Sequence, residues 1–323
     1  MADVIRVRTP GGVDQLELAS VELPALAPSE VRLRQTAIGV NFIDIYQRAG
    51  LYALPQAKIP GVEAVGIVSA VGAEVTQLKV GDRIAYAGAP VGAYASERNL
   101  PVWRAVKLPD TLSDEAVAST FVKGITAHML LTRIYPVERA TTLLVHSAAG
   151  GLGRLLTRWA SHIGARVIGT VGSDAKAETA RVAGAHHVIV GRDADFARTV
   201  ADLTDKGGVD VAYDGVGGTT FLKTLACVRP FGMVMSIGQA GGPIPLLDLE
   251  EIGPRRSLML ARPSVMAYMN DAETYHRAAG AVLAALQDGI LMGTGTAYRL
   301  GAAAQAQADL ELGRTTGALY LKP

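Results

Sequence analysis

Hydrophobic residues follow two different spacings along this chain. From residue 1 to about 120, short apolar runs such as VRLRQTAIGV (31–40), GVEAVGIVSAVG (61–72) and GDRIAY (81–86) are separated by Gly and Pro. Runs of this length with such punctuation are typical of a β-barrel or β-sandwich. From about 124 to 260, strand-like segments alternate with helical patterns, which predicts a parallel sheet with helices on its faces.

The alternating half contains six candidate strands, and the tail adds two helices and one strand. The candidate strands are Thr142–His146, Arg166–Thr170, His187–Val190, Val209–Tyr213, Met233–Ile237 and Leu258–Leu260. In the tail, from about 261 to 323, the pattern predicts helices at Ala272–Asp288 and Ala302–Leu312 and a last strand at Ala318–Leu321.

A strand-like LLVH (143–146) is followed by a glycine-rich turn and an amphipathic helix. The apolar face of this helix consists of Leu152, Leu155, Leu156, Trp159, Ala160 and Ile163. Its polar face consists of Arg154, Thr157, Arg158, Ser161 and His162. A second strand follows, and this succession within about 30 residues is the βαβ dinucleotide-binding unit.

The turn, AAGGLG at 148–153, suits a bound pyrophosphate. Gly150 and Gly151 are expected to adopt backbone angles that a side chain forbids, and to let the anion approach the main chain. The helix then presents unpaired N–H groups and a positive dipole end, while Gly153 allows close packing on the strand. We predict cofactor contacts at Ala149, Gly150, Gly151 and Leu152. Because Ala148 replaces the first glycine of GxGxxG, a plain βα loop is the alternative.

The second strand ends without the acid that binds the ribose 2′-hydroxyl of NAD. Gly172 stands there, and Ser173, Lys176 and Arg192 offer donors for a 2′-phosphate. Asp174 opposes this interpretation unless it caps the next helix. The pattern favours NADPH as the cofactor, and a solvated helix position is the alternative for Lys176.

Composition and charge argue against several other classes. The 323 residues are 49% hydrophobic and carry a net charge of +1, so no nucleic-acid partner is indicated. The longest uncharged stretch, 230–247, is interrupted by Pro and Gly, so no membrane helix is expected. The N-terminus lacks a signal-peptide pattern and Cys227 is the only cysteine, which predicts a cytoplasmic protein without disulfides.

Seven motifs occur in a fixed order along nearly the whole chain. They are GVNFIDIYQRAGLY (39–52), IPGVEAVGIV (59–68), VGDRIAY (80–86), FVKGITAHMLL (121–131), HSAAGGLG (146–153), GTVGS (169–173) and ARPS (261–264). Together they resemble the NADPH:quinone oxidoreductases, the zeta-crystallin-like branch of the zinc-independent medium-chain dehydrogenases/reductases.

The resemblance implies an α/β fold in which a Rossmann doubly wound parallel sheet is inserted in a GroES-like, partly open β-barrel catalytic domain. The implied domains are 1–123 (catalytic), 124–260 (Rossmann, NADP-binding) and 261–323 (a segment returning to the catalytic domain). The resemblance also implies a homodimer, with a tetramer as the alternative, and in the dimer edge strands of two Rossmann sheets pair. The stretch GGPIPLLDLEEI (241–252) is expected near that edge, with a surface loop as the alternative.

The chain departs from the zinc-dependent relatives at their metal ligands. Asn41 lies where the catalytic cysteine is expected, and Val62 replaces the histidine of Gly-His-Glu, although Glu63 remains. Cys227 falls in a predicted helix, and the pair at 186–187 leads into a strand that directs its side chains to opposite faces. No metal is expected.

The resemblance implies a substrate pocket lined by Asn41, Tyr46, Tyr52 and Arg262. Asn41 and Tyr46 are also expected to contact the cofactor. Tyr52 is expected to cover the substrate and donate a proton or hydrogen bond, and Arg262 to place positive charge where the electrons arrive. The alternatives are a loop role for Asn41, barrel packing for the tyrosines and an ion pair for Arg262.

Further cofactor contacts are implied by the resemblance. They are Thr126, Gly215, Val216, Gly217, Ile237, Gly238, Gln239 and Arg314. Gly191 stands where bacterial relatives commonly have a tyrosine beside the adenine phosphate, so weaker NADPH binding or a looser cofactor choice is expected.

Three functions are compatible with these features. The favoured one is NADPH-dependent reduction of a small quinone or other electrophilic carbonyl, by hydride or by sequential single electrons. The second is a 2-alkenal or enoyl-thioester reductase on the same scaffold. The third is a non-catalytic NADPH-binding or RNA-binding protein, which the lack of aromatic–basic repeats disfavours. The sequence does not name the electron acceptor.

Overall fold

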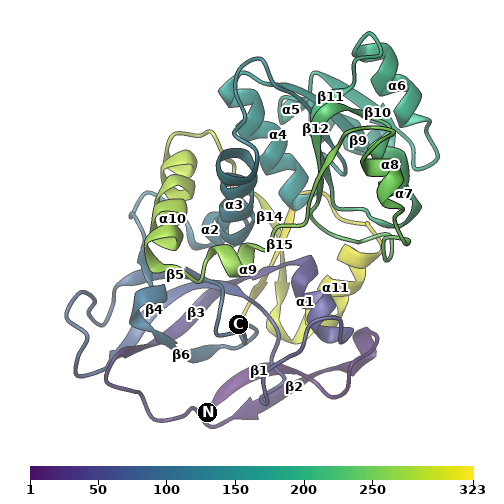
Figure 1. Cartoon of the computed structure of the whole chain (residues 1–323). Helices are drawn as coiled ribbons and strands as arrows, with labels where there is room; N and C mark the ends of the chain where they lie inside the picture. The colour runs from purple at the N-terminus through teal and green to yellow at the C-terminus, as the bar shows by residue number, and fades with distance from the viewer. The chain divides into compact units, whose positions relative to one another are not determined.

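The computed structural model describes all residues from 1 to 323 and divides them into two compact units. Unit 1 comprises Met1–Ile125 and Val265–Pro323, and unit 2 comprises Thr126–Ser264 (Figure 1). No helix combines the length and the apolar character that a bilayer crossing requires.

Unit 2 is built on a six-stranded parallel sheet in the order β10-β9-β8-β11-β12-β13. Counted along the chain, this is the order 3-2-1-4-5-6 of the classical dinucleotide-binding fold. The predicted Rossmann sheet is therefore confirmed. Its strands are β8 (Thr142–Val145), β9 (Arg166–Val171), β10 (His187–Val190), β11 (Val209–Asp214), β12 (Val228–Ser236) and β13 (Met259–Ala261).

Helices cover both faces of this sheet. They are α4 (Gly151–Ile163), α5 (Asp174–Val182), α6 (Phe196–Leu203), α7 (Gly218–Leu225) and the short α8 (Leu249–Ile252). Figure 1 shows α4 on one side of the sheet and α6 and α7 on the other. Phe196 and Phe221, from α6 and α7, share a core with sheet residues such as Leu144 and Val234.

All six candidate strands of this half are present; β10 has the predicted bounds, and the other five are shifted at one or both ends, by one residue except at the start of β12. β12 begins at Val228 rather than at the predicted Met233 and includes Pro230 and Gly232. Val228 already pairs with Val209, and regular pairing resumes where Met233 meets Val211, so the intervening residues form an irregularity within the strand. β13 begins at Met259, one residue after the predicted start.

The predicted amphipathic helix is α4, but its buried stripe differs from the prediction. Leu155, Leu156 and Ala160 are buried as expected, whereas Trp159 is only partly covered. Thr157, which was predicted on the polar face, is fully buried. The reason is that α4 contacts α5 as well as strands β8 and β9, so the covered stripe is wider than one sheet-facing side.

Unit 1 contains a seven-stranded sheet in the order β14-β15-β3-β4-β5-β7, with β6 paired to β3. Its strands are β3 (Glu30–Val40), β4 (Glu63–Val71), β5 (Arg83–Ala87), β6 (Glu97–Pro101), β7 (Val106–Lys107), β14 (Gly295–Arg299) and β15 (Ala318–Lys322), beside the hairpin of β1 (Ala2–Val7) and β2 (Leu16–Val21). Its helices are α1 (Phe42–Arg48), α2 (Asp114–Ala118), α9 (Val265–Tyr268), α10 (Ala272–Gln287) and α11 (Ala303–Glu311), while α3 (Phe121–His128) runs across the unit boundary into a π-helical turn, Met129–Ile134.

The C-terminal segment is part of the unit 1 sheet. β15 runs antiparallel to β3, with Leu319 opposite Val40, and β14 pairs with β15 (Figure 1). The helix α11 lies against α1, where the buried Arg48 donates hydrogen bonds to Gln307 Oε1 at 2.9 Å and Glu311 Oε1 at 2.8 Å. The tail thereby supports the segment that begins at Asn41.

Candidate functional site

The glycine-rich turn after β8 leads into α4 with little room for side chains. A Cβ on Gly153 would lie 2.2 Å from the Ser147 carbonyl oxygen, and one on Gly150 would lie 3.1 Å from the same atom. The expected close packing at Gly153 is thus present. The expected reason for Gly150 was wrong, because its φ of −76° is open to any residue. Ser147, at φ 52°, is the residue in the left-handed region.

Gly150 is the N-cap of α4 and brings no side chain to the first helical turn. Ala149 is buried, whereas Gly150, Gly151 and Leu152 are partly exposed. The main chain at the positive end of the helix dipole is therefore accessible, and an anion would find N–H donors there.

Two cations meet at the end of β9. A Cβ on Gly172 would lie 3.5 Å from Arg192 Nε, so the Arg192 side chain lies beside this glycine. Partial burial lowers the pKa of Lys176, and the positive charge of Arg192 lowers it further. Two like charges held this close favour an anion between them. Ser173 is the exposed N-cap of α5, whereas Asp174 is the first helical residue and not the cap.

Asp214, the last residue of β11, organises the loop that follows it. Its Oδ1 accepts hydrogen bonds from the backbone N–H of Val216 at 2.8 Å and of Gly217 at 2.9 Å. The Gly215 and Val216 carbonyls accept from Ala240 and Gly241 in the loop after β12, at 3.1 and 2.7 Å. The structure therefore brings together two predicted contact segments, Gly215–Gly217 and Ile237–Gln239.

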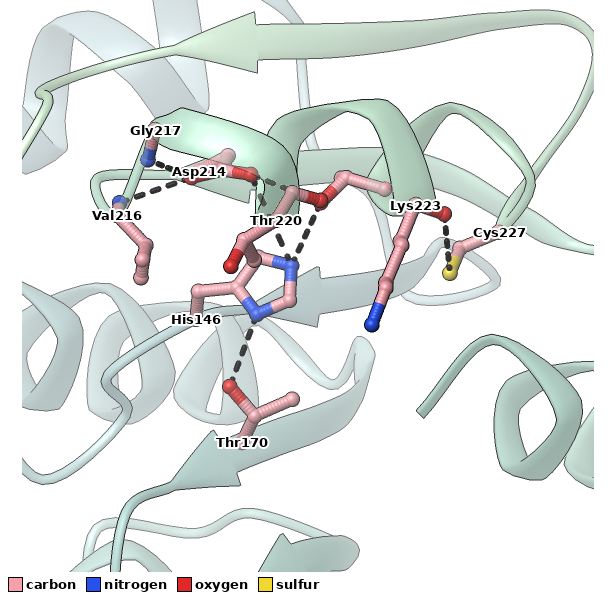
Figure 2. A network of polar contacts seen from close by, with 9 residues as sticks. His146, Thr170, Asp214, Val216, Gly217, Thr220, Lys223 and Cys227 are labelled. Atoms are coloured by element: carbon pink, nitrogen blue, oxygen red, sulfur yellow. Dashed lines mark hydrogen bonds and ion pairs between the residues drawn. The ribbon is translucent and has the colours of Figure 1, made fainter. Parts of the chain in front are cut away.

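A buried polar chain connects Asp214 to the ends of β8 and β9 (Figure 2). Thr224 Oγ1 in α7 lies 2.8 Å from Asp214 Oδ2 and 2.9 Å from His146 Nε2, and His146 Nδ1 lies 2.9 Å from Thr170 Oγ1. None of these side chains was predicted from the sequence as a site residue. His146 stood inside the quoted motif HSAAGGLG, which was the available signal, but nothing marked Thr224.

Arg262, Thr126 and Cys227 of unit 2 lie outside the loops described so far. Arg262 follows β13 and donates from its Nη2 to Gln239 Oε1 at 3.1 Å, which joins it to the loop after β12. Thr126 is the first residue of unit 2 and is partly exposed. Cys227 was predicted in a helix but lies in the turn between α7 and β12, where burial raises its pKa to about 12.

In unit 1, Asn41 is held by a buried carboxylate. Its Nδ2 donates to Glu63 Oε1 at 2.9 Å, and Glu63 also accepts from Val122 N–H at 2.7 Å and faces Lys123 Nζ at 3.5 Å. Because an ionised carboxylate only accepts hydrogen bonds, the amide nitrogen of Asn41 must face Glu63. A Cβ on Gly39 would lie 2.2 Å from Glu63 Oε1, so this glycine makes room for the carboxylate.

The two predicted tyrosines, Tyr46 and Tyr52, are neighbours. Tyr46 lies in α1, and its ring meets that of Tyr52 edge-on with centroids 5.7 Å apart. Tyr52 follows the helix and is 43% exposed. Both tyrosines stand close along the chain to Asn41, at the start of the same helix. Arg314 lies apart near the C-terminus, where it faces Asp309 at 3.7 Å.

Asp44 is a buried acid that sequence analysis did not identify. Its Oδ2 accepts from the Asn41 backbone N–H at 2.8 Å and from the Tyr94 hydroxyl at 3.0 Å, while Oδ1 has no hydrogen-bond partner. Burial raises the pKa of Asp44 to about 7, with a smaller contribution from Glu63. The carboxyl is therefore poised to change its charge near neutral pH.

The donor set at the positions of catalytic zinc does not fit this metal. An amide at Asn41 and an aliphatic side chain at Val62 replace a thiolate and an imidazole, and Glu63 is engaged by Asn41, Val122 and Lys123. No group of three or more His, Cys, Asp or Glu side chains is arranged to hold a metal ion. The reaction of this protein is therefore derived without a zinc ion.

The fold and these sites define an oxidoreductase of the medium-chain dehydrogenase/reductase class. A family model described as the alcohol dehydrogenase GroES-like domain matches residues 27–110, and one described as zinc-binding dehydrogenase matches residues 151–282. Although the second model is described as zinc-binding, this chain has Asn41 and Val62 at two of the expected zinc-ligand positions.

Similar proteins narrow this class. A quinone oxidoreductase from Pseudomonas aeruginosa is 39% identical, with full coverage of both chains. A 2-haloacrylate reductase from a Burkholderia species is also 39% identical, over the whole of this chain and 99% of its own length. The crystal structure of Escherichia coli quinone oxidoreductase complexed with NADPH superposes with a TM-score of 0.96 at 34% identity, and both chains are fully covered. This chain belongs to the quinone oxidoreductase family.

Proposed function

We propose that this protein reduces quinones with NADPH and uses no metal. The assignment of NADPH rests on two cations, Lys176 and Arg192, that lie close together beside Gly172. An NAD-selective site has an acid at this strand end. The quinone oxidoreductase relatives, one of them a complex with NADPH, support the same assignment.

Unit 2 would hold the cofactor through residues at the carboxyl edge of its sheet. The main chain at Ala149, Gly150, Gly151 and Leu152 suits the pyrophosphate, since the dipole of α4 favours negative charge there. The 2′-phosphate would be held by Ser173, Lys176 and Arg192 beside Gly172. The segments Gly215–Gly217 and Ile237–Gln239, with Thr126, are proposed as further contacts from unit 2, and Arg314 as a contact from unit 1.

NADPH, when bound, supplies the hydride. The chain's own groups have to orient the quinone and stabilise the oxygen on which negative charge develops. We propose that Tyr52, which is partly exposed, donates a hydrogen bond and then a proton from its hydroxyl to this oxygen, and that the Tyr46 ring supports the Tyr52 ring. Arg262 would add positive charge. Asn41, whose amide nitrogen is held by Glu63, would offer its carbonyl oxygen as an acceptor to a ribose hydroxyl.

A second candidate is the reduction of a carbon–carbon double bond conjugated to a carboxylate or carbonyl. It is favoured by the 39% identity to a 2-haloacrylate reductase over this whole chain, equal to the identity with the quinone oxidoreductase. Both reactions deliver hydride to an electron-poor carbon, so the acceptor-binding residues decide between them.

Absorbance at 340 nm tests the two candidates directly. NADPH oxidation would be measured with 1,4-benzoquinone, 9,10-phenanthrenequinone, 2-chloroacrylate and crotonyl-CoA, each repeated with NADH. Quinone turnover with NADPH supports the proposal. Turnover of 2-chloroacrylate or crotonyl-CoA without quinone turnover would assign the second candidate, and cofactor binding without any turnover would indicate a non-catalytic role.

We propose that the protein is a homodimer joined through β13. This strand is at the edge of the unit 2 sheet, and its Met259 and Leu260 are 45% and 44% exposed. Leu246 and Leu249, in the predicted stretch 241–252, are also exposed. An uncovered apolar edge strand is a template for pairing with a second copy. Light scattering should show a dimer, and Leu260→Pro, which removes a strand N–H, should yield monomers.

We also propose a cytoplasmic location, because the single unpaired Cys227 suits a reducing compartment.

A further inference from the structure

Four side chains in unit 2 join three strand ends that the linear sequence keeps apart. His146 directly follows β8, Thr170 lies near the end of β9, Asp214 ends β11, and Thr224 reaches them from α7. His146 is 4% exposed, and Asp214 and Thr224 are fully buried. Figure 2 shows the imidazole of His146 between Thr170 and α7, below the Asp214 side chain.

The chemistry of Asp214 gives this chain of hydrogen bonds a direction. The Thr224 hydroxyl lies 2.8 Å from Asp214 Oδ2 and 3.0 Å from the Thr220 carbonyl oxygen in its own helix. A carboxylate accepts hydrogen bonds, and Thr224 is the donor that faces Oδ2, so we place the hydroxyl proton toward Asp214. The Thr224 oxygen then accepts from His146 Nε2, which must carry the ring proton, and His146 Nδ1 accepts from the Thr170 hydroxyl. Burial lowers the pKa of His146 despite the opposite effect of Asp214, in agreement with a neutral ring.

The other oxygen of Asp214 carries the network into the predicted cofactor site. Oδ1 accepts from the N–H groups of Val216 and Gly217, and the carbonyls of this loop accept from Ala240 and Gly241. Both carboxylate oxygens of Asp214 therefore accept hydrogen bonds, because Oδ2 accepts from the Thr224 hydroxyl. A change at Thr224 would therefore free one oxygen of a buried charge and alter how it holds the loop.

We infer that Thr224, together with His146, is a positioning residue of the cofactor site: it fixes the Asp214 carboxylate, which in turn sets the loop at Gly215–Gly217. Thr224 itself contacts no ligand in this scheme. The inference rests on the proposed function, since it takes NADPH as the ligand whose site the loop forms. It extends the site to a helix residue on which none of the sequence motifs falls.

The test compares isosteric variants of two buried threonines. Thr224→Val removes the hydroxyl at constant shape, and Thr224→Ser restores it. Thr157→Val is the matched control, because Thr157 is equally buried, lies in α4 of the same unit, and has a hydroxyl without a hydrogen-bond partner. The dissociation constant of NADPH would be measured by calorimetry, and the amide exchange of Val216 and Gly217 without cofactor.

Thr224→Val is expected to weaken NADPH binding about tenfold or more, because a hydrogen bond to a buried charge is lost. Thr224→Ser should stay within about twofold of the natural protein, as should Thr157→Val, and amide exchange at Val216 and Gly217 should accelerate only in Thr224→Val. At saturating NADPH the kcat of Thr224→Val should change much less than its KM for NADPH.

Equal NADPH affinity in Thr224→Val and Thr157→Val would overturn the inference, and so would a Thr224→Ser variant as weak as Thr224→Val. A natural protein that does not bind NADPH would instead overturn the proposed function itself. Should Thr224→Val fail to fold, Thr170→Val tests the partly exposed end of the hydrogen-bond network. The NADPH affinity of this variant is expected to fall about threefold. Nitrogen NMR of the natural protein then provides a separate check, since a ring proton on His146 Nδ1 would contradict the scheme.

Discussion

Asp44→Asn should change how the stability of unit 1 depends on pH. The Asp44 carboxyl is fully buried, and burial raises its pKa from 3.8 to about 7. The folded chain therefore holds this proton more tightly than the unfolded chain does. Between these two pKa values the folded state binds more protons, so the free energy of unfolding falls as the pH rises. The asparagine variant does not titrate and lacks this loss.

The magnitude follows from the two pKa values. A pKa difference of about three, at about 1.4 kcal/mol for each, corresponds to about 4 kcal/mol over the whole titration. About 3 kcal/mol of this falls between pH 4.5 and pH 8, because the unfolded carboxyl is already mostly ionised at the lower limit. Relative to Asp44→Asn, the natural protein should therefore lose about 3 kcal/mol of stability across this range.

A single tryptophan allows unit 1 to be followed separately. The chain contains Trp103 in unit 1 and Trp159 in unit 2, so a Trp159→Phe background leaves only the Trp103 signal. Trp103 stacks on Arg104, with 3.9 Å from the guanidinium carbon to the ring centroid, and should report on loss of packing. Urea unfolding at several pH values then yields the free energy of unfolding of the natural protein and of Asp44→Asn, provided that the denaturant slope m stays constant.

Asp82→Asn is the matched control. The hydrogen bond from Lys107 lowers the pKa of Asp82 below 3.8, so this carboxyl is ionised in both states throughout the range. Its contribution is present above pH 3.8 and is lost only at lower pH, so the difference between Asp82→Asn and the natural protein should stay flat. Parallel pH profiles of Asp44→Asn and the natural protein would refute the assignment of a raised pKa to Asp44.

Three further changes test the proposed site. Lys176→Ala should raise the KM for NADPH about tenfold and that for NADH much less, with Lys223→Ala as a surface control; equal effects would show that Lys176 does not contact the 2′-phosphate. Gly153→Ala should lower the stability by about 2 kcal/mol or more and weaken NADPH binding, because its Cβ would lie 2.2 Å from the Ser147 carbonyl oxygen; an unchanged Tm would contradict the close packing. Tyr52→Phe should lower kcat for quinones about tenfold or more with little effect on NADPH binding, and an unchanged kcat would remove Tyr52 from the mechanism.

The sequence by itself determined the parts of this protein that depend on neighbouring residues. Apolar spacing located the strands and helices of unit 2, and the run from Ala148 to Gly153 identified the turn at the start of α4. The missing acid at the end of β9 is likewise a local feature, and Gly172 marks it. These features are readable because hydrogen bonding and side-chain periodicity within an element are set over a few residues.

Only the tertiary structure decided which distant side chains meet. Thr224 lies 78 positions from His146, and Glu63 lies 22 from Asn41, yet both pairs form hydrogen bonds at 2.9 Å. The tertiary structure also placed Ser147, and not Gly150, in the left-handed region. Strand order and helix docking bring such residues together, and burial then makes their hydrogen bonds obligatory, because an unpaired polar group without water costs more than the bond contributes.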